Sequence, residues 1–110
     1  MKKIALSPGD PAGIGPEICL KSLQDNSKNL GNFELIGDID FYRKLSKDLN
    51  LNLSFQNICK REDFVTVKNI SLDSEVTFGM PNVSNSKYTL DVLMTGSLGS
   101  LNKEYSALVT

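Results

Sequence analysis

Residues 7–17 read SPGDPAGIGPE, and this stretch shapes the first part of the chain. From Pro8 to Glu17 it holds three glycines and three prolines, and it follows an apolar run at residues 3–6. Glycine tolerates positive φ angles and lets other groups approach the backbone closely, whereas proline fixes φ and suits the first turn of a helix. The pattern predicts a rigid loop that joins a buried strand to a helix beginning at Pro16. Such a loop either contacts a ligand or serves only as a tight connection, and the residues leave both interpretations open.

Strand and helix patterns alternate along the rest of the chain. Apolar residues alternate with polar ones at residues 51–55, which is typical of a half-buried strand. Strands are predicted at residues 3–6, 33–36, 51–55, 65–67 and 107–109, the last of them buried. Helices are predicted from Pro16 to about residue 23, after Asp38 or Asp40 as the capping residue, and at residues 86–101. The alternation predicts an α/β fold with a largely parallel sheet.

Each predicted helix has an expected apolar face. The first helix is expected to bury Ile18 and some of Cys19, Leu20 and Leu23. The second presents Phe41, Leu45 and Leu49. The third carries an apolar stripe of Leu90, Leu93, Met94, Leu98 and Leu101. Gly96 and Gly99 either weaken this third helix or allow it to pack closely. Residues 71–85 are polar and irregular, with Gly79 and Pro81 marking a turn.

The composition excludes several classes of protein. The chain has 110 residues, 40% of them hydrophobic, which suits one domain or part of one. Its 12 basic and 13 acidic residues are scattered, and ten of the basic residues are Lys, which argues against a nucleic-acid partner. No apolar stretch is long enough to cross a membrane. Cys19 and Cys59 match no metal spacing and indicate two reduced thiols in a cytoplasmic protein.

Histidine is absent from the sequence, so no imidazole base or histidine metal ligand is possible within these residues. The opening loop matches neither familiar phosphate loop in full. A lysine is missing for a P-loop, and Ile18 occupies the third glycine position of G-x-G-x-x-G after Gly13 and Gly15. Asp38 stands near the place of a ribose-binding acid, but an aspartate after a strand is also a common helix cap.

The opening stretch SPGDPAGIGPE closely resembles the N-terminal signature of the 4-hydroxythreonine-4-phosphate dehydrogenase family. The likeness continues with FELIGDID at residues 33–40, VTFG at residues 76–79 and SALVT at residues 106–110. It covers essentially the whole chain but only the N-terminal portion of the family, and residues 56–73 match weakly. The resemblance therefore implies that this chain is an N-terminal fragment of such an enzyme.

For the intact enzyme, the resemblance implies a fold similar to that of isocitrate and isopropylmalate dehydrogenases. Residues 1–110 would form the N-terminal part of the first α/β domain, with the second domain absent from this chain. The family's reaction oxidises the C3 hydroxyl of 4-phosphooxy-threonine with NAD or NADP and then releases CO₂, in the biosynthesis of pyridoxal 5'-phosphate (vitamin B6). A divalent metal (Zn, Mg or Co) held by histidines polarises the reacting oxygen. The expected partners are the small phosphorylated amino-acid substrate and a second copy in a homodimer.

The resemblance assigns no catalytic or metal-binding residue to this chain, because the family's histidines and substrate-binding groups have no counterpart here. The opening loop is expected to lie beside the cleft, where it would form one wall. Its candidate cofactor-binding residues are Asp10, Pro11, Ala12, Gly13, Ile14 and Gly15. We expect no turnover and no tightly bound cofactor from the isolated 110 residues.

Two other functions remain open from the residues alone. A related dehydrogenase acting on threonate 4-phosphate would have the same signature. A non-catalytic α/β module that binds a nucleotide or a partner is the second alternative, suggested by the absence of histidine and by the unpaired last strand. If the chain is a fragment whose sheet is cut, the last strand would expose unpaired backbone groups, so the isolated fragment is expected to associate or aggregate.

Overall fold

The structure, a computed structural model, describes residues 3–57, 61–77, 79–80 and 83–110. The helices of this part of the chain are α1 (Gly15–Asp25), α2 (Ile39–Asp48) and α3 (Ser86–Leu101). Its strands are β1 (Lys3–Leu6), β2 (Phe33–Gly37), β3 (Phe55–Gln56), β4 (Val65–Asn69) and β5 (Tyr105–Val109). Two short 3₁₀ segments, η1 (Ser27–Asn32) and η2 (Val83–Asn85), precede β2 and α3. Cys59, Phe78 and Pro81, which the sequence predictions named, lie outside the described residues.

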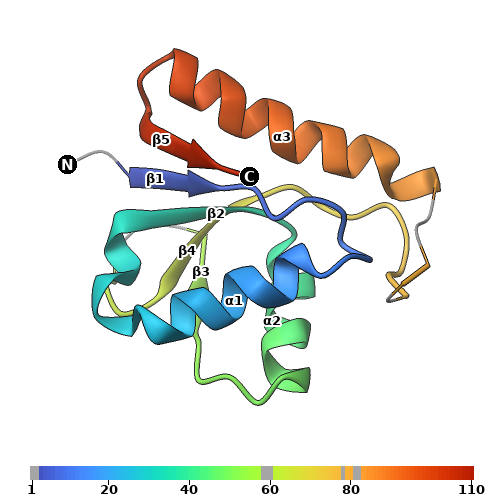
Figure 1. Cartoon of the computed structure of the whole chain (residues 1–110), viewed down its shortest axis with the longest axis horizontal. Helices are drawn as coiled ribbons and strands as arrows, with labels where there is room; N and C mark the ends of the chain where they lie inside the picture. The colour runs from blue at the N-terminus through green and yellow to red at the C-terminus, as the bar shows by residue number, and fades with distance from the viewer. Residues whose placement is uncertain (1–2, 58–60, 78, 81–82) are drawn as a thin grey trace.

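The strands form one parallel sheet in the order β3-β4-β2-β1-β5. Figure 1 shows α3 on one face of this sheet and α1 and α2 on the other. Within the sheet, Ile4 of β1 lies opposite Phe33 of β2 and opposite Ala107 of β5, so the first and last strands are neighbours. The predicted α/β class with a largely parallel sheet is confirmed.

Local signals explain where the first two helices begin. Pro16 stands in the first turn of α1, as predicted from its fixed φ angle and its missing N–H group. Of the two capping candidates, Asp38 is the N-cap of α2, and its carboxylate accepts hydrogen bonds from the backbone N–H groups of Asp40 and Phe41. These interactions satisfy N–H groups that have no partner inside the helix.

The sheet separates two hydrophobic cores. The larger core lies between the sheet and the layer of α1, α2 and η1, and its buried members are Leu20, Leu23, Leu30, Leu35, Ile39, Tyr42, Leu45, Phe55, Val65 and Val67. The smaller core lies under α3, and its buried members are Ala5, Ile36, Tyr88, Val92 and Tyr105. Each face of the sheet therefore has its own apolar layer, as expected for a parallel sheet with helices on both sides.

The strand predicted at residues 51–55 is largely wrong, because only its last residue lies in β3. Asn50 adopts a positive φ of 56° after α2, and the next backbone N–H donates to Ser46 O in α2. The N–H of Asn52 donates to the side-chain oxygen of Gln24, a residue of α1. Helices α1 and α2 thus take up backbone donors that a strand would have used in a ladder, while Leu51 and Leu53 still pack partly buried against the larger core.

Two predictions of helix faces are also wrong. Ile18 is 53% exposed, because α1 turns Pro16, Leu20 and Leu23 toward the sheet. In α3, the apolar stripe predicted from the sequence points away from the sheet, and the helix buries Tyr88, Val92, Gly96 and Gly99 instead. The two glycines allow close packing, since a Cβ at Gly96 would lie 2.6 Å from a methyl carbon of Leu108, and a Cβ at Gly99 2.3 Å from the ring of Tyr105.

The predicted last strand exists as β5, but the expectation that it is buried is wrong. Ala107 and Val109 are exposed, whereas Tyr105 is buried under α3. The reason is its position, because among the described strands β5 lies at the edge of the sheet and pairs with β1. The turn predicted near Gly79 is present, with φ +75° at Gly79 and a hydrogen bond from Met80 N to Thr77 O. Within the described residues, no helix combines the length and the apolar character that a membrane crossing needs.

Candidate functional site

The carboxyl ends of the five parallel strands meet at one edge of the sheet, which is where open α/β folds bind ligands. The opening loop follows β1 at this edge. Its Ser7 N–H donates to Val109 O of β5 (2.9 Å), and its Ala12 O accepts from Gly79 N (2.9 Å). At the end of β2, the N–H of Ile39 donates to the side chain of Asn69 at the end of β4 (2.9 Å). This carboxyl edge is therefore a connected set of loops, and it is the candidate site.

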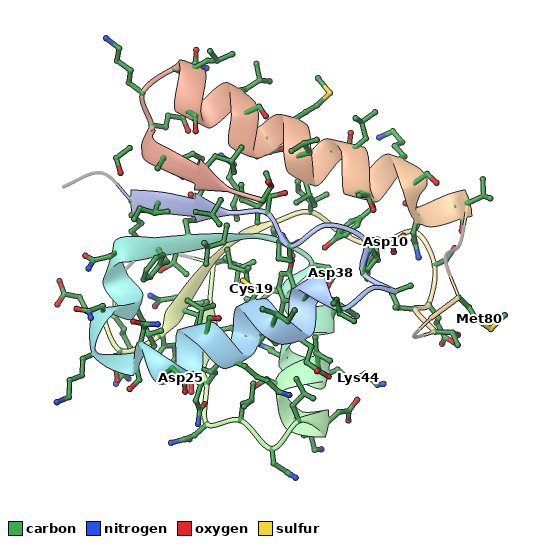
Figure 2. All side chains as sticks on the ribbon, in the orientation of Figure 1. Asp10, Cys19, Asp25, Asp38, Lys44 and Met80 are labelled. Carbon is green, nitrogen blue, oxygen red and sulfur yellow. The ribbon has the colours of Figure 1, made fainter. Side chains whose placement is uncertain are left out.

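The opening loop is folded on itself by Asp10. The carboxylate of Asp10 accepts a hydrogen bond from Ala12 N (2.8 Å), and its carbonyl accepts from Gly13 N (3.0 Å). Asp10 and Ile14 are exposed, and Figure 2 labels Asp10 at the carboxyl edge. Pro11 and Ala12 are buried, and Gly13 and Gly15 are half-buried. The six candidate residues thus form a self-supported turn in which only part of the surface can meet a ligand.

An apolar groove, the α1–β5 groove, opens beside this loop. It has a volume of about 480 Å³. Its lining comes from β1 and the loop, from α1, and from β2 and β5, and consists of Leu6, Ser7, Pro8, Gly15, Ile18, Cys19, Ser22, Leu23, Asn26, Phe33, Val109 and Thr110. Of the six candidate loop residues, this lining includes Gly15. The groove also explains the exposure of Ile18, whose side chain lies on its wall rather than in the core.

Cys19 lies in this groove with a half-buried free thiol. Burial raises the pKa of the Cys19 thiol from 9.0 to about 11. In a Cys59→Ser background, we therefore expect Cys19 to react with iodoacetamide about 100-fold more slowly at neutral pH than a thiol with the ordinary pKa. The rate is expected to rise roughly tenfold per pH unit up to the shifted pKa. Alkylation followed by mass spectrometry measures this rate.

The same shift has a consequence for stability. A thiol whose pKa is raised by folding stabilises the folded state below the unfolded pKa of 9.0, and this contribution is lost as the pH rises through about 11. The free energy of unfolding is expected to decrease over that interval, and to decrease less in a Cys19→Ala variant. Alkylation of Cys19 as fast as that of free cysteine would contradict the burial.

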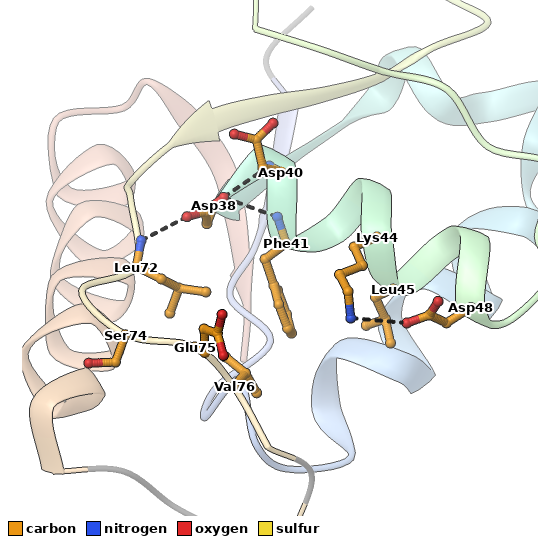
Figure 3. A pocket seen from close by; sticks show the side chains of 10 residues that line it. All are labelled: Asp38, Asp40, Phe41, Lys44, Leu45, Asp48, Leu72, Ser74, Glu75 and Val76. Carbon is orange, nitrogen blue, oxygen red and sulfur yellow. Dashed lines mark hydrogen bonds and ion pairs between the residues drawn. The ribbon is translucent and has the colours of Figure 1, made fainter.

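A second, polar pocket lies where β2 and β4 end (Figure 3). It has a volume of about 370 Å³. Charged side chains dominate its lining, namely Asp38, Asp40, Lys44, Asp48 and Glu75, with Phe41, Leu45, Leu72, Ser74 and Val76 between them. The single lysine already pairs with Asp48 across 3.5 Å. The excess of carboxylates makes this pocket a poor site for a phosphate group.

Asp38 is used structurally in this pocket. Besides capping α2 with one carboxylate oxygen, it accepts a hydrogen bond from Leu72 N with the other (2.8 Å). Figure 3 shows these three interactions converging on one side chain. Of the two roles left open for Asp38, the structure supports the helix cap. The hydrogen bond from Leu72 N also connects α2 to the segment after β4.

Asp38→Ala is expected to lower the free energy of unfolding by about 2–3 kcal/mol, because it removes a helix cap and leaves Leu72 N–H without its acceptor. Asp40→Ala is the matched control, since the Asp40 side chain is 88% exposed and pairs with exposed Arg43. The control is expected to cost no more than about 0.5 kcal/mol. Urea unfolding followed by circular dichroism compares the two, and equal losses would contradict the assigned role.

Sequence reasoning missed two residues that hold the carboxyl edge together. Tyr88 of α3 accepts a hydrogen bond from Asp38 N through its hydroxyl (2.9 Å). Asn85 is 4% exposed, and its side-chain amide bonds to Ser74 N and Ser74 O (3.1 and 3.3 Å). The spacing of Tyr88, Val92 and Gly96 at i, i+4 and i+8 is the signal that would have identified this buried face of α3.

The hydroxyl groups of Tyr88 and Tyr42 both lie next to Gly37, the last residue of β2. The Tyr42 hydroxyl donates to Ile36 O (2.8 Å). Burial raises the pKa of Tyr42 well above its usual value, and the neighbouring Tyr88 raises it further. Burial also raises the pKa of Tyr88, so both tyrosines are protonated at neutral pH. Their hydroxyl groups join α2 and α3 through the end of a central strand.

The described residues do not fit the metal expected for the intact enzyme. Among them, no group of three or more cysteine, aspartate, glutamate or histidine side chains is arranged to hold a metal ion. The complete sequence contains no histidine. Nor does the loop complete a dinucleotide fingerprint, because Ile18 takes the third glycine position and Asp38 is engaged by backbone N–H groups. No catalytic step is assigned to these residues.

Comparison with known proteins gives a consistent result. No family model matches the chain. It is 34% identical over 119 residues to a 4-hydroxythreonine-4-phosphate dehydrogenase from Wigglesworthia glossinidia brevipalpis, covering 100% of the chain and 35% of the relative. It is 31% identical over 114 residues to the enzyme of the same name from Pseudoalteromonas atlantica, covering 98% of the chain and 34% of the relative.

Solved structures agree on the fold. A 4-hydroxythreonine-4-phosphate dehydrogenase from Klebsiella pneumoniae matches with a TM-score of 0.83 and 20% identity, over 98% of this chain and 36% of that one. One from Burkholderia phymatum matches with a TM-score of 0.80 and 18% identity, over 98% and 35%. The fold is thus the isocitrate/isopropylmalate dehydrogenase-like α/β fold of these proteins. The chain spans about a third of the length of the curated relatives that it matches. Its resemblance to the 4-hydroxythreonine-4-phosphate dehydrogenase family, predicted from the sequence, is confirmed by matches that cover 98–100% of the chain.

Proposed function

We propose that residues 1–110 form the N-terminal part of the first α/β domain of an NAD- or NADP-dependent 4-hydroxythreonine-4-phosphate dehydrogenase. The intact enzyme would be a cytoplasmic oxidoreductase of pyridoxal 5'-phosphate biosynthesis. The observation that carries this proposal is the match over the full chain to relatives of that name, each of which is about three times as long. The common name of these relatives favours this function over a threonate 4-phosphate dehydrogenase and over a non-catalytic module.

In this proposal the chain has a structural role in the enzyme and contributes no catalytic group. The carboxyl edge of the sheet would form one wall of the substrate cleft, with residues 10–15 placed beside NAD or NADP. The divalent metal, when bound, would polarise the reacting oxygen of the phosphorylated substrate. Its ligands would come from polypeptide beyond the described residues, since those residues do not fit a metal site. The homodimer of the intact enzyme is part of the same proposal.

The test is a chimera in which residues 1–110 replace the matched stretch of the Wigglesworthia glossinidia relative. We expect the chimera to reduce NAD⁺ or NADP⁺ when given 4-phosphooxy-threonine and Zn²⁺, Mg²⁺ or Co²⁺. The purified 110-residue chain, assayed in parallel, is expected to show no turnover. Turnover by the chain alone would contradict the scaffold role. A chimera that is folded by circular dichroism but inactive would contradict the proposed family function.

A further inference from the structure

Strand β5 is covered by a helix on one face of the sheet but not on the other. Leu108 of β5 pairs with Ala5 of β1, and both pack in the smaller core under α3. Val109 pairs with Leu6 and lies on the opposite face, where α1 and α2 are. Leu6 packs against the larger core there, whereas Val109 is 54% exposed. Among the described residues, no member of that larger core comes from β5. Since a parallel sheet normally has both faces covered, β5 lacks its cover on the α1 side.

The α1–β5 groove lies at this uncovered place. Val109 and Thr110 of its lining come from the end of β5 and the residue after it, and Ile18 and Cys19 come from α1. Ile18 is 53% exposed, about as much as Val109. None of the side chains that line the groove carries a charge. This lining disfavours a charged ligand, and a cluster of exposed apolar side chains is typical of a surface that contacts other polypeptide.

The position of Thr110 indicates which polypeptide this is. Figure 1 shows the C-terminus at the end of β5, beside β1, and Thr110 itself lines the groove. The curated relatives that match the whole chain are about three times as long. In an intact protein of that length, the polypeptide that follows residue 110 would therefore start at the groove.

We propose that the α1–β5 groove is an intramolecular docking site, filled in the intact protein by apolar side chains of the polypeptide that follows residue 110. This inference rests on the proposed function, because it requires residues 1–110 to be the N-terminal part of a longer enzyme. It goes further by naming the surface through which these residues hold the remainder. Docking removes Ile18, Cys19 and Val109 from solvent.

Cys19 is the probe for this contact, because its side chain lies between α1 and the sheet and lines the groove (Figure 2). Alkylation of Cys19 by iodoacetamide is compared between the 110-residue chain and the chimera described above, both carrying Cys59→Ser. Mass spectrometry of the peptide that contains Cys19 gives the two rates. We expect the rate to be at least about tenfold lower in the chimera, because docked polypeptide excludes the reagent.

Lys21→Cys in a Cys19→Ala background is the matched control for the alkylation. Lys21 belongs to the same helix and is exposed, and it is not part of the groove lining. The new thiol is therefore expected to react at the same rate in the 110-residue chain and in the chimera.

A charge placed in the groove tests the same contact through stability. Ile18→Lys is expected to leave the thermal unfolding midpoint of the 110-residue chain nearly unchanged, because this side chain reaches solvent. It is expected to lower the midpoint of the chimera by at least about 5 °C, since docked polypeptide would bury the ammonium group. Leu98→Lys is the matched control, because Leu98 is also 53% exposed and lies on α3, across the sheet. This control is expected to leave both midpoints nearly unchanged.

Equal alkylation rates of Cys19 in the chain and in a folded chimera would overturn the proposal. Protection that grows with the concentration of the 110-residue chain would place a second copy in the groove and overturn it as well. The same holds if Leu98→Lys destabilises the chimera and Ile18→Lys does not, or if the chimera does not fold, because the groove is expected to accept the matched polypeptide. A folded chimera that protects Cys19 but shows no turnover would contradict the proposed family function and leave the docking site standing.

Discussion

Gly15→Ala is expected to destabilise the chain by at least about 3 kcal/mol, a large part of the stability of a small domain. A Cβ at this position would lie 1.9 Å from the carbonyl oxygen of Pro8 and 3.1 Å from its carbonyl carbon. Because the obstructing atoms belong to the backbone of the opening loop, the clash cannot be relieved by a rotamer change. The loop or the first turn of α1 would have to move. Urea unfolding followed by circular dichroism measures the loss.

Gly13→Ala, two residues earlier in the same loop, is the matched control. A Cβ there would lie 3.4 Å from Asp10 O, which is close to ordinary van der Waals contact. The substitution also lowers the entropy of the unfolded chain, so its net effect is expected to stay within about 1 kcal/mol. If the Gly15→Ala variant and the unmodified chain had equal free energies of unfolding, the close approach of Pro8 to α1 would not be required for stability.

Gly37→Ala is expected to have a comparable effect, of about 3–5 kcal/mol, for two reasons that act together. Gly37 has a φ of +145°, which side-chain-bearing residues rarely adopt. A Cβ would also lie 2.3 Å from the hydroxyl oxygen of Tyr42 and 2.4 Å from that of Tyr88. The variant would have to separate α2 from α3 at the end of β2, so the thermal unfolding midpoint is expected to fall sharply.

A mutant cycle separates these two causes. Tyr42→Phe and Tyr88→Phe remove the hydroxyl groups, at the cost of the hydrogen bonds to Ile36 O and from Asp38 N. In the Gly37→Ala background the two tyrosine substitutions are expected to cost less than in the unmodified chain, because they make room for the new methyl group. Strictly additive losses would mean that the positive φ alone accounts for the effect.

Local signals predicted much of the fold. The strand, loop and helix around residues 3–25 follow from the glycines and prolines of the opening stretch, whose backbone preferences depend little on the rest of the chain. The bounds of the helix at residues 86–101 are confirmed as well. Its buried side was predicted wrongly, because both sides of α3 are apolar and only its place on the sheet decides which one packs. The glycines at positions 96 and 99 were the better guide, since they lie where Leu108 and Tyr105 approach.

The candidate site was predictable only in part. A cap at Asp38 is a local property, and the structure confirms it. The hydrogen bonds of Asp38 to Leu72 and of Asn85 to Ser74 join segments separated by 34 and 11 residues, and no sequence pattern records such contacts. Whether residues 10–15 contact a cofactor stays a prediction. Burial of β5 depended on which strands lie beside it, and this is a property of sheet order rather than of the residues of β5.

The pairing of β1 with β5 has a consequence for synthesis on the ribosome. Lys3 lies opposite Tyr105, so β1 gains this second neighbour only after all the residues between these two strands have been synthesised. The nascent chain can already build β1, β2, β4 and β3 with their covering helices α1 and α2. At about 5–20 residues per second, translation of α3 and β5 then takes on the order of a few seconds. During that delay the backbone of β1 offers an open edge, and this interval is when a nascent chain is most exposed to pairing with the wrong strand.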